Sequence, residues 1–247
     1  MKFRTDGLII REQNIGENDR LVWVLTRTHG VVKAFARGAK KLTNSKCSAT
    51  SLLAYSRLTF YKGREHYIIG DAQSLRIFSK LRSDVRKMCL AQYFCELARH
   101  VCPREQSAEQ FLRLFLNSIY LLSENKRSEL LVKPCFEMRF VCMAGYTPDL
   151  LMCGKCGAYT AETMYFLPRE GRLECCGCRR NQNGAVPLNE AALTALRHTV
   201  YAEDNKLFSF AMSDESLEML NRATEMYLRC QLERDFQTLN FYKTISS

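Results

Sequence analysis

The sequence lacks the features that would place it in a membrane or outside the cell. No apolar run reaches the length of about 18 residues that a membrane-spanning helix requires. The first residues, MKFRTD, do not form the apolar core of roughly 7–15 residues that defines a signal peptide. We therefore expect a cytoplasmic protein, in which cysteine thiols stay reduced.

The sequence also lacks the motifs that most enzymes acting on nucleic acids or nucleotides carry. It contains no GxxxxGK[ST] phosphate-binding loop and no HExxH zinc motif, and its four histidines are scattered. A nuclease would need clustered carboxylates to hold metal ions. No DxD or ExK pair occurs among the six acidic residues of positions 1–80. We therefore expect a binding protein and not an enzyme.

Proline and glycine are scarce, with five and twelve residues, which argues against a disordered or fibrous chain. The 247 residues are 47% hydrophobic and 25% charged, as in an ordinary globular protein. A chain of this length buries enough surface to fold without disulfide bonds.

Positive charge is concentrated in the first third of the chain. The formal net charge is +10, and residues 1–80 carry 15 Lys+Arg against 6 Asp+Glu. The remaining residues are nearly balanced. A basic region beside a neutral one favours a polyanionic partner, nucleic acid above all, over charge that only keeps the protein in solution.

Residues 1–80 have the pattern of a small β-domain. Runs rich in β-branched and aromatic residues, bounded by turn residues, predict five strands. They cover residues 7–11, 20–26, 31–37, 55–61 and 66–72. Five short strands predict a small closed sheet, because closure removes exposed strand edges. The OB-fold is the expected five-stranded barrel.

Residues 81–247 predict a helical domain, so the fold class is α+β and multidomain. Apolar residues recur at helical spacing after Ser83, which can cap a helix, and after a capping box at 107–110. They also recur across residues 128–144, where Pro134 marks a kink or the true helix start. Further helices are expected after Asn189 and Ser213, each of which can cap a helix. An insertion at about 146–186 interrupts this domain.

The insertion holds two CxxC pairs, Cys153–Cys156 and Cys175–Cys178, with 18 residues between them. This spacing is typical of a structural site in which four thiolates hold one zinc ion. Residues 166–173 between the pairs predict a β-hairpin, as in a zinc ribbon. Cys176 is an alternative ligand to Cys175. Four unliganded thiols and a redox dithiol are the other interpretations, the second without a surrounding βαβ pattern.

Side-chain alternation sorts the basic residues of the predicted barrel. In the third strand, Val32, Ala34 and Ala36 form an apolar set that can face the core. Lys33, Phe35 and Arg37 then point outward. In the fourth strand Leu58 and Phe60 face inward, and the outward set is Tyr55, Arg57, Thr59 and Tyr61. Cations between aromatic rings are typical of proteins that bind single-stranded nucleic acid.

These residues together resemble the bacterial RecO family of DNA repair proteins. The resemblance rests on GLIIR at 7–11, GENDR at 16–20, ARGAKK at 36–41 and FYKG at 60–63. The order of the parts, a barrel followed by helices with a cysteine-pair insertion, is also similar. Many members lack the zinc cysteines, so the prediction of zinc rests on the spacing in this sequence.

The resemblance implies a nucleoid-associated recombination mediator that binds single- and double-stranded DNA and anneals complementary strands. It also implies that the protein contacts RecR and the C-terminal tail of the single-stranded DNA-binding protein SSB, and helps to load RecA. Lys33 and Arg37 match the DNA-binding positions of the third strand, and Lys40 and Lys41 match the following loop, which we expect to be flexible. Charge and position alone add four further candidates: Arg11, Arg57, Lys62 and Arg64.

Two other functions fit parts of the pattern. A zinc-ribbon transcription or translation factor would share the cysteines and the basic charge, but would not anneal naked strands. A protein-only adaptor would use the basic barrel to meet an acidic protein and would have no affinity for DNA.

Overall fold

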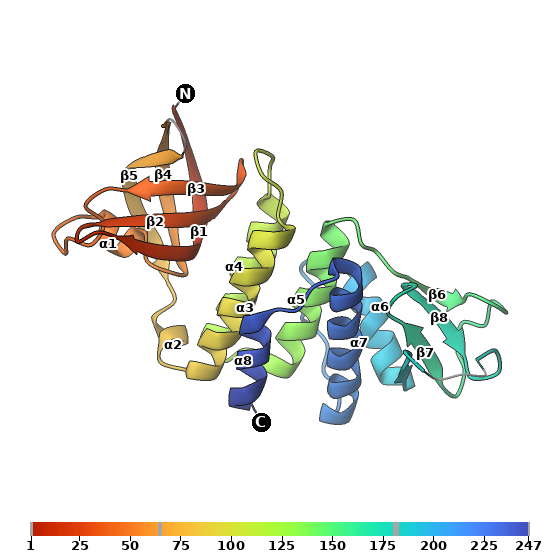
Figure 1. Ribbon diagram of the computed structural model, residues 1–247. Helices are drawn as coiled ribbons and strands as arrows, with labels where there is room; N and C mark the ends of the chain where they lie inside the picture. Colours follow the sequence, from red (N-terminus) through yellow and green to blue (C-terminus); the bar gives the residue numbers. More distant parts are fainter. Residues whose placement is uncertain (1, 64–65, 180–182, 247) are drawn as a thin grey trace. The chain divides into compact units, whose positions relative to one another are not determined.

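The computed structural model describes residues 2–63, 66–179 and 183–246, which form two compact units (Figure 1). The first unit comprises the chain up to Glu124 together with the segment from Phe236 onward, and the second comprises Asn125–Asp235. None of the helices in the described part of the chain combines the length and the apolar character that a membrane crossing needs.

A five-stranded barrel begins the first unit. Its strands are β1 (Lys2–Ile15), β2 (Asp19–Thr26), β3 (Gly30–Ala36), β4 (Ala54–Lys62) and β5 (Tyr67–Ile77). They pair in the cyclic order β1-β2-β3-β5-β4, and all pairs except β3–β5 are antiparallel. Among the described residues, the parallel β3–β5 seam pairs Ala34 with Tyr67 and Phe35 with Ile68. All five predicted strands are present, and β1 is much longer than predicted.

The barrel core contains the apolar side chains that alternation assigned to it. Val32, Ala34 and Ala36 of β3 and Leu58 and Phe60 of β4 are buried in one cluster. The alternate residues of β3, Lys33 and Phe35, are half-buried, as expected for the outer face.

Five helices complete the first unit: α1 (Lys46–Ala49), α2 (Ser79–Arg82), α3 (Val85–Val101), α4 (Glu109–Ser123) and α8 (Gln237–Ser246). Two predicted caps are wrong. The carboxylate of Asp84, and not Ser83, accepts from the Lys87 N–H and caps α3. Ser107 makes no capping contact and instead donates to the Arg27 carbonyl, because the chain before α4 is paired with the barrel.

Helix α8 returns from the far end of the sequence to pack on α3. Phe236 is fully buried, with its ring centroid 5.7 Å from that of Tyr93. The carboxylate of Glu96 on α3 accepts from both the backbone N–H and the hydroxyl of Thr238, at the first turn of α8. A carboxylate at a helix N-terminus satisfies an unpaired N–H and complements the helix dipole.

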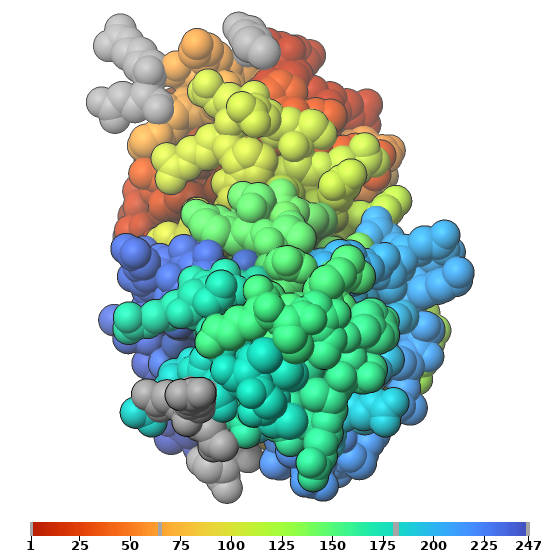
Figure 2. All heavy atoms as spheres, turned by 90° about the vertical axis from the view of Figure 1, so that its right-hand side faces the viewer, coloured from red at the N-terminus to blue at the C-terminus, as the bar shows by residue number. Residues whose placement is uncertain are grey.

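The second unit combines three helices with a small sheet. The helices are α5 (Glu129–Met143), α6 (Glu190–Tyr201) and α7 (Asp214–Leu232), and Pro134 lies inside α5. Asn189 and Ser213 cap α6 and α7 as predicted. The sheet strands are β6 (Asp149–Cys153), β7 (Met164–Leu167), β8 (Arg172–Cys175) and β9 (Val186–Leu188), in the order β6-β8-β7-β9. The predicted hairpin is β7–β8. In Figure 2 the teal and cyan atoms of this region lie on the face toward the viewer.

Candidate functional site

A row of three side chains crosses the outer face of the barrel. Trp23 on β2 pairs with Arg11 on β1 and with Lys33 on β3. The Arg11 guanidinium carbon lies 4.7 Å from the centroid of the Trp23 ring, and the Lys33 Nζ lies 5.2 Å from it. Each cation is within the range of a cation–π interaction. Two predicted DNA-binding residues therefore meet at an aromatic ring that the sequence analysis did not single out.

Trp23 and Lys33 line a cleft of about 620 Å³ in the first unit, between the barrel and the C-terminal end of α3. Lys62 also lines the cleft, although β4 is not a neighbour of β3 in the sheet. The opposite wall carries Arg99 and Arg104. Cations from three parts of the chain are thus gathered around one concavity.

The segment that follows α3 is fixed to the barrel by backbone pairing. The Val31 N–H donates to the Pro103 carbonyl at 3.0 Å, and the Glu105 N–H donates to the His29 carbonyl at 3.1 Å. Gly30 makes this approach possible, because its φ is +61° and a Cβ there would lie 2.0 Å from the Pro103 oxygen. The cleft wall that bears Arg104 is therefore held in register with β3.

Arg37, Lys40 and Lys41 follow the far end of β3 and form a separate basic group. Two contacts tie this loop to the barrel. The Gly38 N–H donates to the Asp19 carboxylate at 2.8 Å, and Ala39 is fully buried in the barrel core. Arg37 and Lys41 remain exposed on this anchored turn.

Arg57 is set apart from the other predicted DNA-binding residues. It lies on β4, and its guanidinium forms an ion pair with the Asp6 carboxylate at 2.8 Å. The hydrogen bond that Arg57 donates to the Asp6 carboxylate raises the pKa of Arg57 above its ordinary value. A phosphate would have to compete with Asp6 for this cation. Arg64, the remaining candidate, lies outside the described residues.

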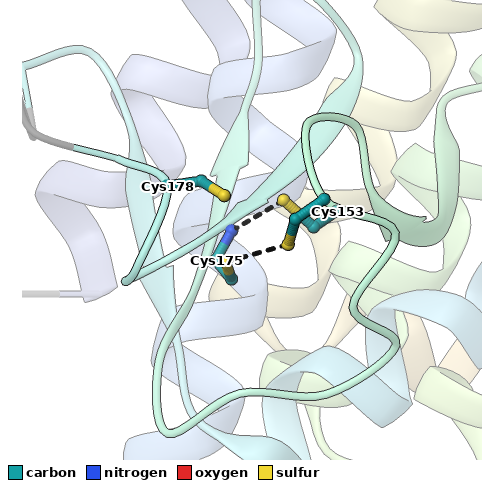
Figure 3. Close-up of side chains that lie close together, drawn as sticks. Cys153, Cys175 and Cys178 are labelled. Carbon is teal, nitrogen blue, oxygen red and sulfur yellow. Dashed lines mark hydrogen bonds between the residues drawn. The ribbon is translucent and has the colours of Figure 1, made fainter.

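The second unit brings the four predicted zinc ligands together. The sulfur atoms of Cys153, Cys156, Cys175 and Cys178 all lie within 4.8 Å of one another. Figure 3 shows Cys153, Cys175 and Cys178 pointing toward a common centre. A tetrahedron of sulfurs at about 2.3 Å from a zinc ion has edges of about 3.8 Å. The 3.6 Å separation of the Cys156 and Cys175 sulfurs fits such an edge.

Cys176 is not part of this cluster. Its side chain is exposed, and its N–H donates to the Thr163 carbonyl, which continues the β7–β8 pairing. Of the two alternatives left by the sequence, Cys175 is therefore the cluster member. The turn after the first pair depends on Gly157, which has a φ of +74° and donates to the Cys153 carbonyl.

Backbone donors prepare the cluster for negative charge. Burial acts to raise the pKa of the Cys153 thiol, but hydrogen bonds from the N–H groups of Cys156, Cys175 and Lys155 outweigh it. They lower the pKa of Cys153 to about 6. Hydrogen bonds with Cys156 and Cys175 raise the pKa of Cys178 to about 12. A divalent cation would replace the protons that the metal-free cluster must hold.

Three cations gather at Glu174, the residue before Cys175. Glu174 lies in β8 and is buried. Its carboxylate oxygens lie within 3.4 Å of side-chain nitrogens of Lys155, Arg172 and Arg179. Four thiolates and one divalent ion would carry a net charge of −2, which these side chains offset. The donor set and its surroundings fit a closed structural zinc site with no position for water or substrate.

Sequence reasoning missed Trp23, Arg99 and Arg104. The alternation that was applied to the third and fourth strands would have placed Trp23 outward, since Val22 and Val24 face the core. Arg99 and Arg104 reach the cleft through the packing of α3 on the barrel, which leaves no local pattern in the sequence.

Known protein families and individual proteins match this chain along nearly its whole length. The family model "Recombination protein O N terminal" matches residues 1–78, and "Recombination protein O C terminal" matches residues 82–240. A DNA repair protein RecO of Acetivibrio thermocellus is 32% identical over 98% of this chain and 96% of its own length. Those of Symbiobacterium thermophilum and Dehalococcoides mccartyi are each 29% identical over 99% of this chain, covering 98% and 96% of their own lengths.

Proposed function

Because this chain belongs to the RecO family of DNA repair proteins, we propose that it is a recombination mediator that anneals complementary DNA strands. It binds single- and double-stranded DNA through phosphates, without reading sequence. No bond is made or broken in this function.

The observation that carries the proposal is the gathering of barrel cations in two groups. Arg11 and Lys33 contact Trp23, and Lys33 and Lys62 line its cleft. Arg37, Lys40 and Lys41 follow one another on the anchored turn. Contacts of Lys and Arg with phosphate supply affinity that is independent of sequence and falls steeply with salt. Annealing requires this chemistry, because two phosphate backbones approach each other only when their charge is neutralised.

We assign the barrel to the OB-fold. The cyclic strand order β1-β2-β3-β5-β4 and the parallel β3–β5 seam support this assignment, and OB-folds are frequent binders of oligonucleotides. We propose that residues 1–80 are the DNA-binding domain and residues 81–247 a helical domain, which the cysteine insertion at about 146–186 interrupts.

The helical domain has the partner-binding role in this proposal. It contacts the acidic C-terminal tail of SSB, and the protein acts with RecR to help load RecA onto SSB-coated DNA. Zinc, held by the four clustered cysteines, fixes the fold of the insertion and takes no part in chemistry.

Binding and annealing of labelled single strands by the wild type and by the double variant Lys33→Glu/Arg37→Glu test the proposal. Measurements at about 50 and 200 mM salt should show a loss of wild-type affinity of several orders of magnitude if six or more phosphates are contacted. The folded double variant should lose both binding and annealing. Arg57→Glu is the control, because its charge is already engaged by Asp6, and it should lose much less.

Equal binding by the wild type and the double variant would place the DNA site elsewhere in the protein. A wild type that binds no DNA at low salt would overturn the proposal and favour a protein-only adaptor. DNA binding without annealing would instead favour the zinc-ribbon factor.

A further inference from the structure

We propose that Trp23 is the stacking platform for an unpaired base of single-stranded DNA, which enters the cleft beside it. The inference rests on the proposed function and adds to it a means of distinguishing single strands from duplex. A base inside a duplex has both faces covered by its neighbours, so it cannot stack on a side chain without leaving the helix.

The position of Trp23 on β2 is unusual for so large an apolar residue. Val22 and Val24 on either side point into the barrel core and are fully buried. Leu21 and Leu25, which share the outward direction of Trp23, are also buried. Trp23 is the residue of this outward set that stays half-buried, and it lines the cleft. The indole therefore has an apolar surface that the protein leaves partly uncovered.

Two cations contact the indole ring. Arg11 and Lys33 approach the ring from the neighbouring strands at 4.7 and 5.2 Å. A cation–π contact at a partly exposed site is weak, at about 0.5–1 kcal/mol. A base can displace either cation from the ring at little cost, and the displaced cation is then positioned to bind the phosphate attached to that base.

The remaining walls of the cleft suit a nucleotide chain. Lys62, Arg99 and Arg104 contribute cations, and Tyr67 contributes a second aromatic side chain. Glu105 is the one acidic residue among the described residues that line the cleft. A positively charged groove with aromatic side chains is the combination by which proteins hold single strands without sequence preference.

Trp23 is the only tryptophan of the chain, so its fluorescence reports on this site directly. Titration of the intact protein with a thymidine oligonucleotide should quench the emission strongly as binding saturates. A blunt duplex of equal length, bound to saturation at low salt, should leave the emission nearly unchanged because its bases stay paired.

Substitution gives the second readout. Trp23→Ala should weaken binding of the oligonucleotide by about 5- to 150-fold and change duplex binding by no more than about two-fold. Trp23→Phe, which keeps a stacking surface and the fold, should recover much of the affinity. Tyr61→Ala is the matched control, because Tyr61 is an exposed aromatic of the same barrel that does not line the cleft, and it should bind like the wild type.

The inference fails if single-stranded DNA binds to saturation with unchanged tryptophan emission, or if Trp23→Ala binds the oligonucleotide as the wild type does. Either result leaves the proposed function in place. A wild type that binds neither the single-stranded oligonucleotide nor the duplex would overturn the proposed function itself. If Trp23→Ala does not fold, the wild-type emission and the Trp23→Phe variant decide the question.

Discussion

The sulfur atoms of Cys156 and Cys175 lie 3.6 Å apart, although 19 positions separate the two residues in the sequence. They are brought together because β6, which leads into the first cysteine pair, runs parallel to β8, which leads into the second. The antiparallel β7–β8 hairpin fixes the position of β8. The position of the four sulfur atoms thus depends on the pairing of the sheet strands.

Neighbouring cysteines should differ sharply in their effect on metal content. We expect Cys175→Ser to lose zinc, because one of the four sulfurs is removed, and Cys176→Ser to retain it. Zinc per protein chain, measured by inductively coupled plasma mass spectrometry after purification, checks this. Zinc retained in Cys175→Ser and lost in Cys176→Ser would show that Cys176, and not Cys175, is the third ligand.

Removal of zinc should loosen the insertion without abolishing DNA binding by the barrel. Binding of a structural ion is coupled to the folding of its site. A chelator should therefore make residues 146–186 sensitive to protease, while affinity for single-stranded DNA changes little. Limited proteolysis and DNA binding on the same chelated sample check both parts. A large loss of DNA affinity would place the insertion in the DNA site.

The cap of α3 gives a paired prediction on stability. Asp84→Ala should lower the free energy of unfolding by about 1 kcal/mol, as is typical for a lost N-cap. Ser83→Ala should change it by less than about 0.5 kcal/mol, since Ser83 donates only to the Lys80 carbonyl. Denaturant unfolding of both variants checks this, and equal effects would contradict the assignment of the cap.

The ionisation of Asp84 should make the stability of the protein depend on pH. Hydrogen bonds from the Lys87 side chain and backbone hold the pKa of Asp84 below its ordinary value. The ionised carboxylate therefore stabilises the folded state fully above the ordinary pKa, and this contribution disappears as the pH falls through the lowered value. The difference in stability between the wild type and Asp84→Ala should shrink toward zero in strong acid. A stability difference between the wild type and Asp84→Ala that grows as the pH falls would contradict this role of the Asp84 carboxylate.

A buried ionic network in the second unit should be costly to break. Lys133 lies 2.9 Å from Glu137 and 3.3 Å from Glu225, and Glu137 is fully buried and also accepts from the Thr224 hydroxyl. Lys133→Met should cost about 3–5 kcal/mol of stability, because it leaves a buried carboxylate without its cation.

The control for this network is a surface pair. Lys80 lies 2.6 Å from Glu124, but its side chain is 65% exposed. Lys80→Met should therefore cost no more than about 1 kcal/mol. Denaturant unfolding measures both variants, and a cost for Lys133→Met as small as that for Lys80→Met would show that Glu137 is solvated or protonated.

Local chemistry made much of the fold predictable. The strands of the barrel follow from alternation, as the buried Ala34 beside the half-buried Lys33 illustrates. Asn189 and Ser213 are caps in both sequence and structure, because capping involves only residues within one turn. The predicted caps at Ser83 and Ser107 are wrong, because the Asp84 carboxylate caps α3 and Ser107 donates to the distant Arg27 carbonyl instead.

The candidate site was predictable to a similar extent. The CxxC spacing identified the cysteine cluster, because metal geometry constrains local spacing. The cleft could not be predicted, since it depends on the pairing of Gly30 with the segment after α3, more than 70 residues away along the chain. The pairing of β1 with β4 places Asp6 beside Arg57, which no local pattern showed, so Arg57 resembled the other barrel cations in the sequence.

The salt dependence of single-stranded DNA binding tests the central claim, that the barrel cations contact phosphates, most directly. The logarithm of the binding constant should fall linearly with the logarithm of salt concentration, and the slope should become shallower by about 0.7 for each phosphate contact that is lost. We expect that change for Lys33→Ala, twice that change for Lys33→Ala/Arg37→Ala, and none for Arg57→Ala. Identical slopes for the wild type and the Lys33→Ala/Arg37→Ala variant would contradict the assignment of the barrel face as the DNA site.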